Sequence, residues 1–241
     1  MLLDGRQAVE LGHCLSAQAG AAALALSRGA RDKLQPGVDA NEDGALAVTD
    51  GQRTFIAVAD GHFGADASIE VLEHLAARFA DGLPSEPLRD DELVALVTDA
   101  GAAAWQATRA LPYPRRGSRT TLACALLTPE WVQWASLGDS AVYLGDGTQL
   151  NTPVPVYLGG PLEAAHVAAA LDRGTRSAEP VLLVTDGFTD TLPMDETIRA
   201  AVADVSHTHA LAARLLAEAL HAQASDNLAI ATAAPPHQPD S

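Results

Sequence analysis

The residues of this sequence that could do chemistry are aspartates placed beside glycine or asparagine at the ends of apolar runs. They occur in four short motifs: Asn41-Glu42-Asp43, Asp60-Gly61-His62, Asp186-Gly187 and Asp226-Asn227. Carboxylates that converge in a fold repel one another, and burying them without a counter-charge is costly. A divalent cation removes that cost, and oxygen ligands suit Mg²⁺ or Mn²⁺. The pattern therefore predicts a metal site, and the alternative is four unrelated turn aspartates.

Strands are the elements that must position these acids. Asp60 directly follows the apolar run 55–59, and Asp186 follows the run 181–185. Short apolar runs rich in Val, Ile and Leu predict buried strands. The other two acids precede expected strands, Asp43 before 45–48 and Asp226 before 228–232. If these strands lie side by side, the carboxylates meet at one rim.

Turn residues support this arrangement. Asp50-Gly51 separates the runs 45–48 and 55–59, which predicts a β-hairpin, because Asp-Gly favours a tight turn. Gly61 allows a tight backbone turn after Asp60, and its carbonyl could itself be a metal ligand.

The rest of the chain alternates between blocks of strands and blocks of helices. Apolar spacing predicts helices over 65–80, 91–108, 163–171, 195–203 and 209–223, and strands over 21–27, 120–127, 131–137 and 141–144. Such blocks indicate a layered α+β domain rather than a parallel βαβ sheet. We expect an N-terminal extension over 1–18, one domain over 19–234, and a disordered tail over 235–241.

Composition limits the partners and the compartment. The 241 residues carry a net charge of −16, which excludes nucleic acid and anionic membranes as expected partners. Cys14 and Cys124 fit neither a zinc motif nor a disulfide framework, which indicates a reducing compartment. The apolar stretch 19–26 is too short to span a bilayer, and no signal peptide is expected. A cytoplasmic location follows as an expectation.

Taken in order, the motifs resemble those of the metal-dependent protein phosphatases of type 2C, over about residues 20–233. The resemblance rests on Asn41-Glu42-Asp43, Val58-Ala59-Asp60-Gly61-His62-Phe63-Gly64, Gly117-Ser118-Arg119-Thr120-Thr121-Leu122, Leu137-Gly138-Asp139-Ser140, Asp186-Gly187-Phe188-Thr189-Asp190 and Ser225-Asp226-Asn227. It implies a four-layer αββα fold, an antiparallel β-sandwich flanked by helices.

The resemblance also implies a centre of two metal ions. Asp60 would bridge both ions, with Asp43 bound directly or through water, and Gly61 would offer its carbonyl to one of them. Asp186 and Asp226 would hold the other ion. Asp139, with Asp186, matches the acids that hold a third, weaker ion. His62 would be the general acid that protonates the leaving alkoxide, and its alternative is an ordinary loop histidine.

The sequence departs from the family at two positions that concern phosphate. Val38 stands where the family has a phosphate-binding Arg, and Ala141 follows the Gly-Asp-Ser motif where an Arg is usual. The possible replacements are Arg28, Arg31, Lys33 and Arg119. The stretch between Asp139 and Asp186 is also short for the family, and we infer that its flap, over 150–176, is reduced or absent.

The expected function is hydrolysis of phosphoserine and phosphothreonine on proteins by a water that Mg²⁺ or Mn²⁺ activates. Its partners would be a phosphorylated protein and the pathway of a Ser/Thr kinase. Val38, Ala141 and the short flap motivate a rival, a phosphatase fold that binds a partner or metal with weak or no turnover. A third possibility is an unrelated metal hydrolase acting on small phosphate esters.

Overall fold

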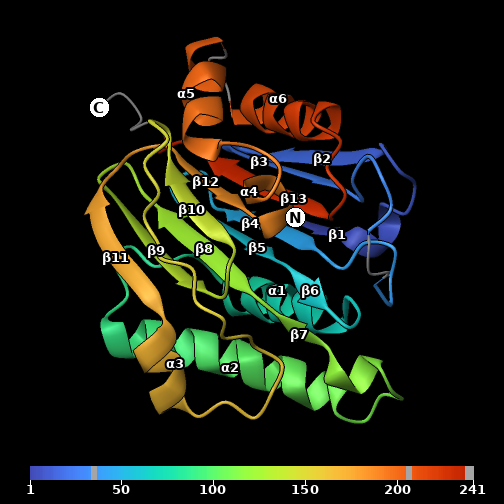
Figure 1. Ribbon diagram of the computed structural model, residues 1–241. Coiled ribbons are helices and arrows are strands. Elements are labelled where there is room, and N and C mark those ends of the chain that lie inside the picture. The colour runs from blue at the N-terminus through green and yellow to red at the C-terminus, as the bar shows by residue number, and fades with distance from the viewer. Residues whose placement is uncertain (34–36, 205–207, 237–241) are drawn as a thin grey trace.

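Two antiparallel β-sheets form the centre of the protein, and helices cover the outer face of each one (Figure 1). The structure is a computed structural model that describes residues 1–33, 37–204 and 208–236. The larger sheet has the strand order β1 (Leu2–Asp4), β4 (Gly44–Thr49), β5 (Thr54–Ala59), β8 (Leu122–Leu127), β9 (Trp131–Leu137) and β11 (Asp172–Ser177). The other sheet has the order β10 (Ala141–Leu144), β12 (Val181–Val184), β13 (Leu228–Ala233), β3 (Ala22–Ser27) and β2 (Cys14–Ala19).

Helices form the two outer layers. The larger sheet is covered by α1 (Asp66–Arg78) and α2 (Asp90–Thr108), with the short α3 (Ala164–Ala170) against α2. The second sheet is covered by α5 (Met194–Asp204) and α6 (Thr208–His221), next to the short α4 (Asp186–Thr189). This is the four-layer αββα arrangement that the sequence predicted.

Alternation along the strands builds three apolar layers. On β5, Ile56 and Val58 face the second sheet, whereas Phe55 and Ala57 face α1 and α2. Successive side chains of a strand point to opposite faces, so a strand buried on both faces must be apolar throughout. This explains why the central strands appear in the sequence as continuous apolar runs.

The Asp50-Gly51 turn joins β4 and β5 as predicted, and Gly51 has a positive φ of 88°. A small third sheet pairs β6 (Gly61–His62) with β7 (Arg119–Thr120), so that Gly61 lies opposite Thr120. This pair places the Asp60-Gly61-His62 motif beside the Gly-Thr-Thr segment.

The first residues are part of the sandwich. β1 pairs with β4, and β2 pairs with β3, so residues 1–18 supply an edge strand to each sheet. The expected domain start at residue 19 falls inside β2, which continues from Cys14 to Ala19. Residues 237–241 of the expected tail lie outside the described residues.

The stretch expected to hold a reduced flap contains an extended segment, then α3 and the unpredicted strand β11. β11 has the sequence Asp-Arg-Gly-Thr-Arg-Ser and pairs with β9 at the edge of the larger sheet. The backbone of β11 pairs with β9 although its side chains are polar, because an edge strand has one neighbour and an exposed face. Within the described ranges, no helix combines the length and hydropathy that a membrane crossing needs.

Candidate metal centre

The predicted acids meet at one end of the sandwich. Asp60 directly follows β5, Asp186 begins α4 shortly after β12, and Asp139 lies in the turn between β9 and β10. One carboxylate oxygen from each of the three lies within 4.8 Å of the others. Asp43 precedes β4, and Asp226 precedes β13, at the same end.

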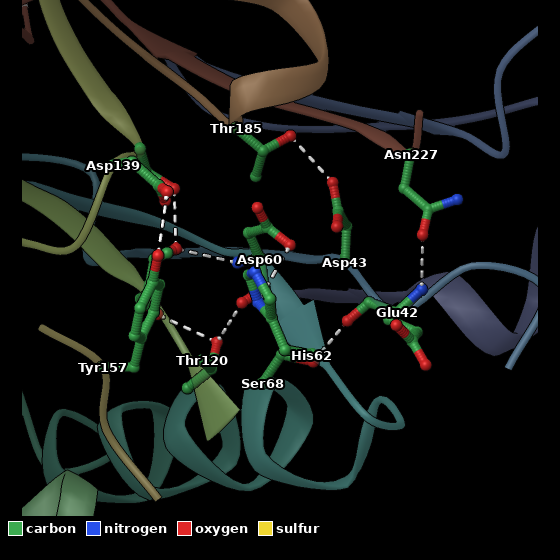
Figure 2. Close-up of polar contacts among 12 residues, drawn as sticks. Glu42, Asp43, Asp60, His62, Ser68, Thr120, Asp139, Tyr157, Thr185 and Asn227 are labelled. Carbon is green, nitrogen blue, oxygen red and sulfur yellow. Dashed lines mark hydrogen bonds and ion pairs between the residues drawn. The ribbon is translucent and has the colours of Figure 1, made fainter. Parts of the chain in front are cut away.

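Burial makes this cluster costly to ionise. Asp43 is 1% exposed and accepts a hydrogen bond of 2.7 Å from Thr185 Oγ1 (Figure 2). Burial raises the pKa of Asp43 to about 8, although Lys33 and the Thr185 hydrogen bond oppose the rise. Burial, followed by the charges of Asp43 and Asp186, raises the pKa of Asp60 well above its usual range. The pKa of Asp186 is raised too, by burial and then by Asp226.

These residues fit a divalent cation. The donor set consists of carboxylate oxygens, which Mg²⁺ and Mn²⁺ prefer. Asp139 Oδ1 is buried and has no hydrogen-bond partner within the described residues. A bound cation would satisfy that oxygen and remove the repulsion that raises the pKa values of the aspartates.

A pocket of about 280 Å³ opens onto the cluster. Its lining includes four of the predicted metal ligands, Asp60, Gly61, Asp186 and Asp226, and the predicted catalytic residue His62. Asp43 is close enough to this group for its charge to interact with those of Asp60, Asp186 and Asp226. The structure thus brings together all of the residues that the sequence nominated for metal binding and catalysis.

Two glycines are required for this close packing. A Cβ on Gly61 would meet Glu42 O at 2.3 Å, and one on Gly187 would meet Asn227 O at 2.0 Å. Any other residue at either position would push backbone segments of the site apart.

Side chains other than the acids fix the backbone around the acids. Thr120 Oγ1 donates to Asp60 O at 2.8 Å, and Asp60 N donates to Thr121 Oγ1 at 3.0 Å. Asn227 Oδ1 accepts from Glu42 N at 2.9 Å, which ties the Asp226 loop to the Asp43 loop (Figure 2). Motifs that are far apart in the sequence are therefore held in register by hydrogen bonds.

His62 stands at the edge of the pocket. Its Nδ1 lies 3.8 Å from Asp60 Oδ1, and 39% of its side chain is exposed. That Nδ1 atom is buried and has no hydrogen-bond partner within the described residues. The imidazole instead contacts the ring of Tyr157, with ring centroids 5.0 Å apart (Figure 2).

Of the four cations nominated to replace the missing Arg, Lys33 lines the pocket. The other three side chains bond elsewhere: Arg28 to Val9 O and Asp32, Arg31 to Gln223 O, and Arg119 to Ser118 O and over the Trp105 ring. Lys33 Nζ lies 2.5 Å from Asp226 Oδ1. Burial alone would lower the pKa of Lys33, but Asp43 and the bond to Asp226 raise it.

Sequence reasoning missed Tyr157, Thr185 and the side chain of Glu42. Thr185 carried a signal, because it directly precedes Asp186 at the end of a buried strand. Glu42 stood inside a nominated motif, but its carboxylate binds backbone N–H groups of Val38, Asp39 and Gly64 and so positions loops. Tyr157 had no signal, since it reaches the site only through the path of the segment before α3.

Comparisons with known proteins agree with this fold. The fold matches that of a bacterial serine phosphatase with a TM-score of 0.74 and 20% identity, over 91% of this chain and 99% of that one. The catalytic domain of the serine/threonine protein phosphatase PstP, solved with two manganese ions, matches with a TM-score of 0.69 and 21% identity, over 92% and 99% of the two chains.

Stp1 from Staphylococcus aureus matches with a TM-score of 0.71 and 18% identity, over 93% of this chain and 96% of that one. At these identities the likeness concerns the fold. A search of curated proteins finds no match. The family model described as protein phosphatase 2C matches residues 20–225, which include every motif acid except Asp226. The chain therefore belongs to the protein phosphatase 2C family.

Proposed function

We propose that this protein hydrolyses phosphoserine and phosphothreonine on proteins, with Mg²⁺ or Mn²⁺ as its cofactor. The observation that carries the proposal is the convergence of Asp60, Asp139 and Asp186, whose oxygens lie within 4.8 Å of one another. Asp60 and Asp186 also line an open pocket together with His62, which could donate a proton, and the cation Lys33. Hydrolysis of an alkyl phosphate ester uses metal-binding acids, a cation and a proton donor in one place, and residues of all three types line this pocket.

Each acid has a proposed role at the cation sites. Asp60 would hold both of two ions, and Asp43 would bind directly or through water. The Gly61 carbonyl would serve one ion, and Asp186 with Asp226 would hold the other. Asp139, with Asp186, would hold a third and weaker ion. Cations bound there would lower the pKa of a coordinated water and neutralise charge on the phosphoryl group.

His62 is proposed to protonate the leaving alkoxide. Its ring is at the pocket edge and partly exposed, so a substrate oxygen can approach it. Lys33 is proposed to bind the phosphoryl oxygens in place of the Arg that the family has at position 38. An ammonium is a point charge without the fork of a guanidinium, so it would hold the phosphoryl group with less geometric control.

The substrate would be a protein that a Ser/Thr kinase has phosphorylated. We propose that the phosphatase acts in the cytoplasm. Support for the compartment comes from Cys14 and Cys124, which are both free thiols. Cys124 is buried, and burial raises its pKa to about 12, which keeps that thiol unreactive.

The test is a Mn²⁺-dependent assay with 4-nitrophenyl phosphate and a phosphothreonine peptide. The wild-type protein should release phosphate from both, and Asp60→Ala should reduce release to background. Asp146→Ala is the matched control, because Asp146 lies in an exposed turn and its substitution should leave activity unchanged. No phosphate release with saturating Mg²⁺ or Mn²⁺ would refute the proposal.

A second candidate is a phosphatase fold that binds a phosphoprotein or a metal without turnover. The ion pair between Lys33 and Asp226 favours it, since that ammonium competes with a cation for one of the ligands. Val38 and Ala141, which replace two arginines of the family, point the same way. This candidate predicts binding of the phosphopeptide without phosphate release, so measured turnover would rule it out.

A further inference from the structure

The segment 151–158 crosses from the second sheet toward the small β6–β7 sheet, and both of its ends are fixed. At the first end, Asn151 is buried, and its side chain bonds Val142 N, Ser136 Oγ and Ser140 O at 2.8 to 2.9 Å. At the other end, Leu158 is 0% exposed and exchanges two backbone hydrogen bonds with Thr120, of 3.0 and 2.8 Å.

Between these ends the segment passes the turn that carries Asp139. Val154 N donates to Gly138 O at 2.9 Å, which holds the two backbones together. Tyr157 is thereby placed between two predicted site residues (Figure 2). Its hydroxyl donates to Asp139 Oδ2 at 3.2 Å, and its ring lies 5.0 Å from the His62 ring at an angle of 50°.

The contact with Tyr157 gives the two carboxylate oxygens of Asp139 different surroundings. Oδ2 accepts from Tyr157, and Oδ1 is buried without a partner in the described part of the chain. Oδ1 is therefore the oxygen free to take a cation. Groups that hydrogen-bond a ligand orient it, and their loss commonly weakens metal affinity by roughly 10- to 100-fold.

The contact with His62 has a different consequence. Histidines that act as acids are usually oriented by a hydrogen bond to one ring nitrogen. Here Nδ1 has no such partner among the described residues, and Asp60 is 3.8 Å away. Packing against the Tyr157 ring therefore limits the orientation of the imidazole.

We propose that Tyr157 is a positioning residue for both Asp139 and His62, its hydroxyl acting on the metal ligand and its ring on the proton donor. The second half rests on the proposed function, whereas the first half needs metal binding alone. The two halves separate by substitution, because Tyr157→Phe removes the hydroxyl and keeps the ring, and Tyr157→Leu removes both.

Calorimetric titration of the metal-free protein with Mn²⁺ tests the hydroxyl. Tyr157→Phe should weaken the site that contains Asp139 by about tenfold. Asp139→Asn should abolish that site, and the double variant should show the same remaining Mn²⁺ binding as Asp139→Asn alone. Tyr143→Phe is the matched control, since Tyr143 is a buried tyrosine of β10 that packs in the layer under α5 and α6. Wild-type affinity in Tyr157→Phe would overturn this half.

The ring is tested by the choice of leaving group. 4-Nitrophenolate leaves without protonation, whereas the alkoxide of a phosphoserine peptide needs a proton donor. Tyr157→Leu should therefore lower kcat on the peptide by at least tenfold more than Tyr157→Phe does, with a smaller change on 4-nitrophenyl phosphate. Equal losses on the two substrates would overturn this half. If the wild-type protein releases no phosphate, the proposed function fails, and the calorimetry still decides the role of the hydroxyl.

Discussion

The ammonium of Lys33 lies 2.5 Å from Asp226 Oδ1, at the mouth of a pocket lined by Asp60 and Asp186. In the metal-free protein this ammonium is the counter-charge of the acidic cluster. Its pKa is raised by Asp43 and Asp226 against the effect of burial, so it stays charged at neutral pH. Lys33 therefore has two consequences, one for metal affinity and one for the phosphoryl group.

Lys33→Gln should bind Mn²⁺ roughly tenfold more tightly, because a positive charge beside the proposed metal ligands is removed. The same variant should raise the KM for a phosphothreonine peptide by about tenfold, since a charge-assisted contact to the phosphoryl oxygens is lost. Calorimetry and steady-state kinetics measure the two effects. Arg31→Gln removes a charge that bonds Gln223 O instead and should change neither value. Unchanged Mn²⁺ affinity and KM in Lys33→Gln would show that Lys33 acts on neither the metal nor the phosphoryl group.

The metal-free protein should lose stability as pH rises from about 4 to about 8. The pKa of Asp43 is raised by burial from 3.8 to about 8, so the folded state holds a proton that the unfolded chain releases in this window. The contribution of this proton to the free energy of unfolding is fully present below the unfolded pKa and is lost through the folded pKa. Asp60 and Asp186 act in the same direction.

Urea unfolding in EDTA at several pH values measures this slope. The total loss in the free energy of unfolding between pH 4 and pH 8 should amount to about a few kcal/mol. Saturating Mn²⁺ should raise stability and reverse the slope, because the cation binds the ionised carboxylates. Asp43→Asn should flatten the slope in EDTA, whereas Asp146→Asn, in an exposed turn, should keep it. A metal-free protein equally stable at pH 5 and pH 8 would contradict the prediction.

Thr185→Val should destabilise the protein and weaken its metal site. Thr185 Oγ1 donates to Asp43 Oδ2 at 2.7 Å and accepts from Ala229 N at 2.9 Å, and valine has a similar shape without either bond. Leaving these buried groups unpaired should cost about 1–3 kcal/mol in the free energy of unfolding. Thr232→Val in β13 removes a hydroxyl bonded to Thr208 O, away from the acids, and should leave Mn²⁺ affinity unchanged. Equal Mn²⁺ affinities in the two variants would show that Thr185 does not support Asp43.

Glu42→Gln should loosen the wall of the pocket without unfolding the protein. Glu42 Oε1 accepts from Val38 N at 2.7 Å, Asp39 N at 3.2 Å and Gly64 N at 2.7 Å, which joins two loops. A neutral amide accepts these bonds more weakly than a carboxylate. Hydrogen exchange should become faster in peptides covering 37–39 and 63–64. Glu73→Gln, on the exposed face of α1, is the control, and equal exchange in both variants would argue against this role.

Much of the fold could be predicted because the central strands are buried on both faces. The run 55–59, the Asp50-Gly51 turn and the helical spacing over 65–80 each carry a local signal that tertiary contacts reinforce. Of the four edge strands of the two large sheets, only β10 carries such a signal, because its four residues are apolar and buried. β11 is polar, β1 has three residues, and β2 is partly exposed, because an edge strand pairs through its backbone on one side only.

The sequence by itself determined the chemistry of the site, because acids at strand ends beside glycine and asparagine are local patterns. Tertiary structure decided the partners of those acids. The packing of distant segments decides which of the four cations reaches the pocket. It also brings Tyr157 into contact with both Asp139 and His62. Such contacts join residues whose spacing along the chain has no period, so only the folded chain specifies them.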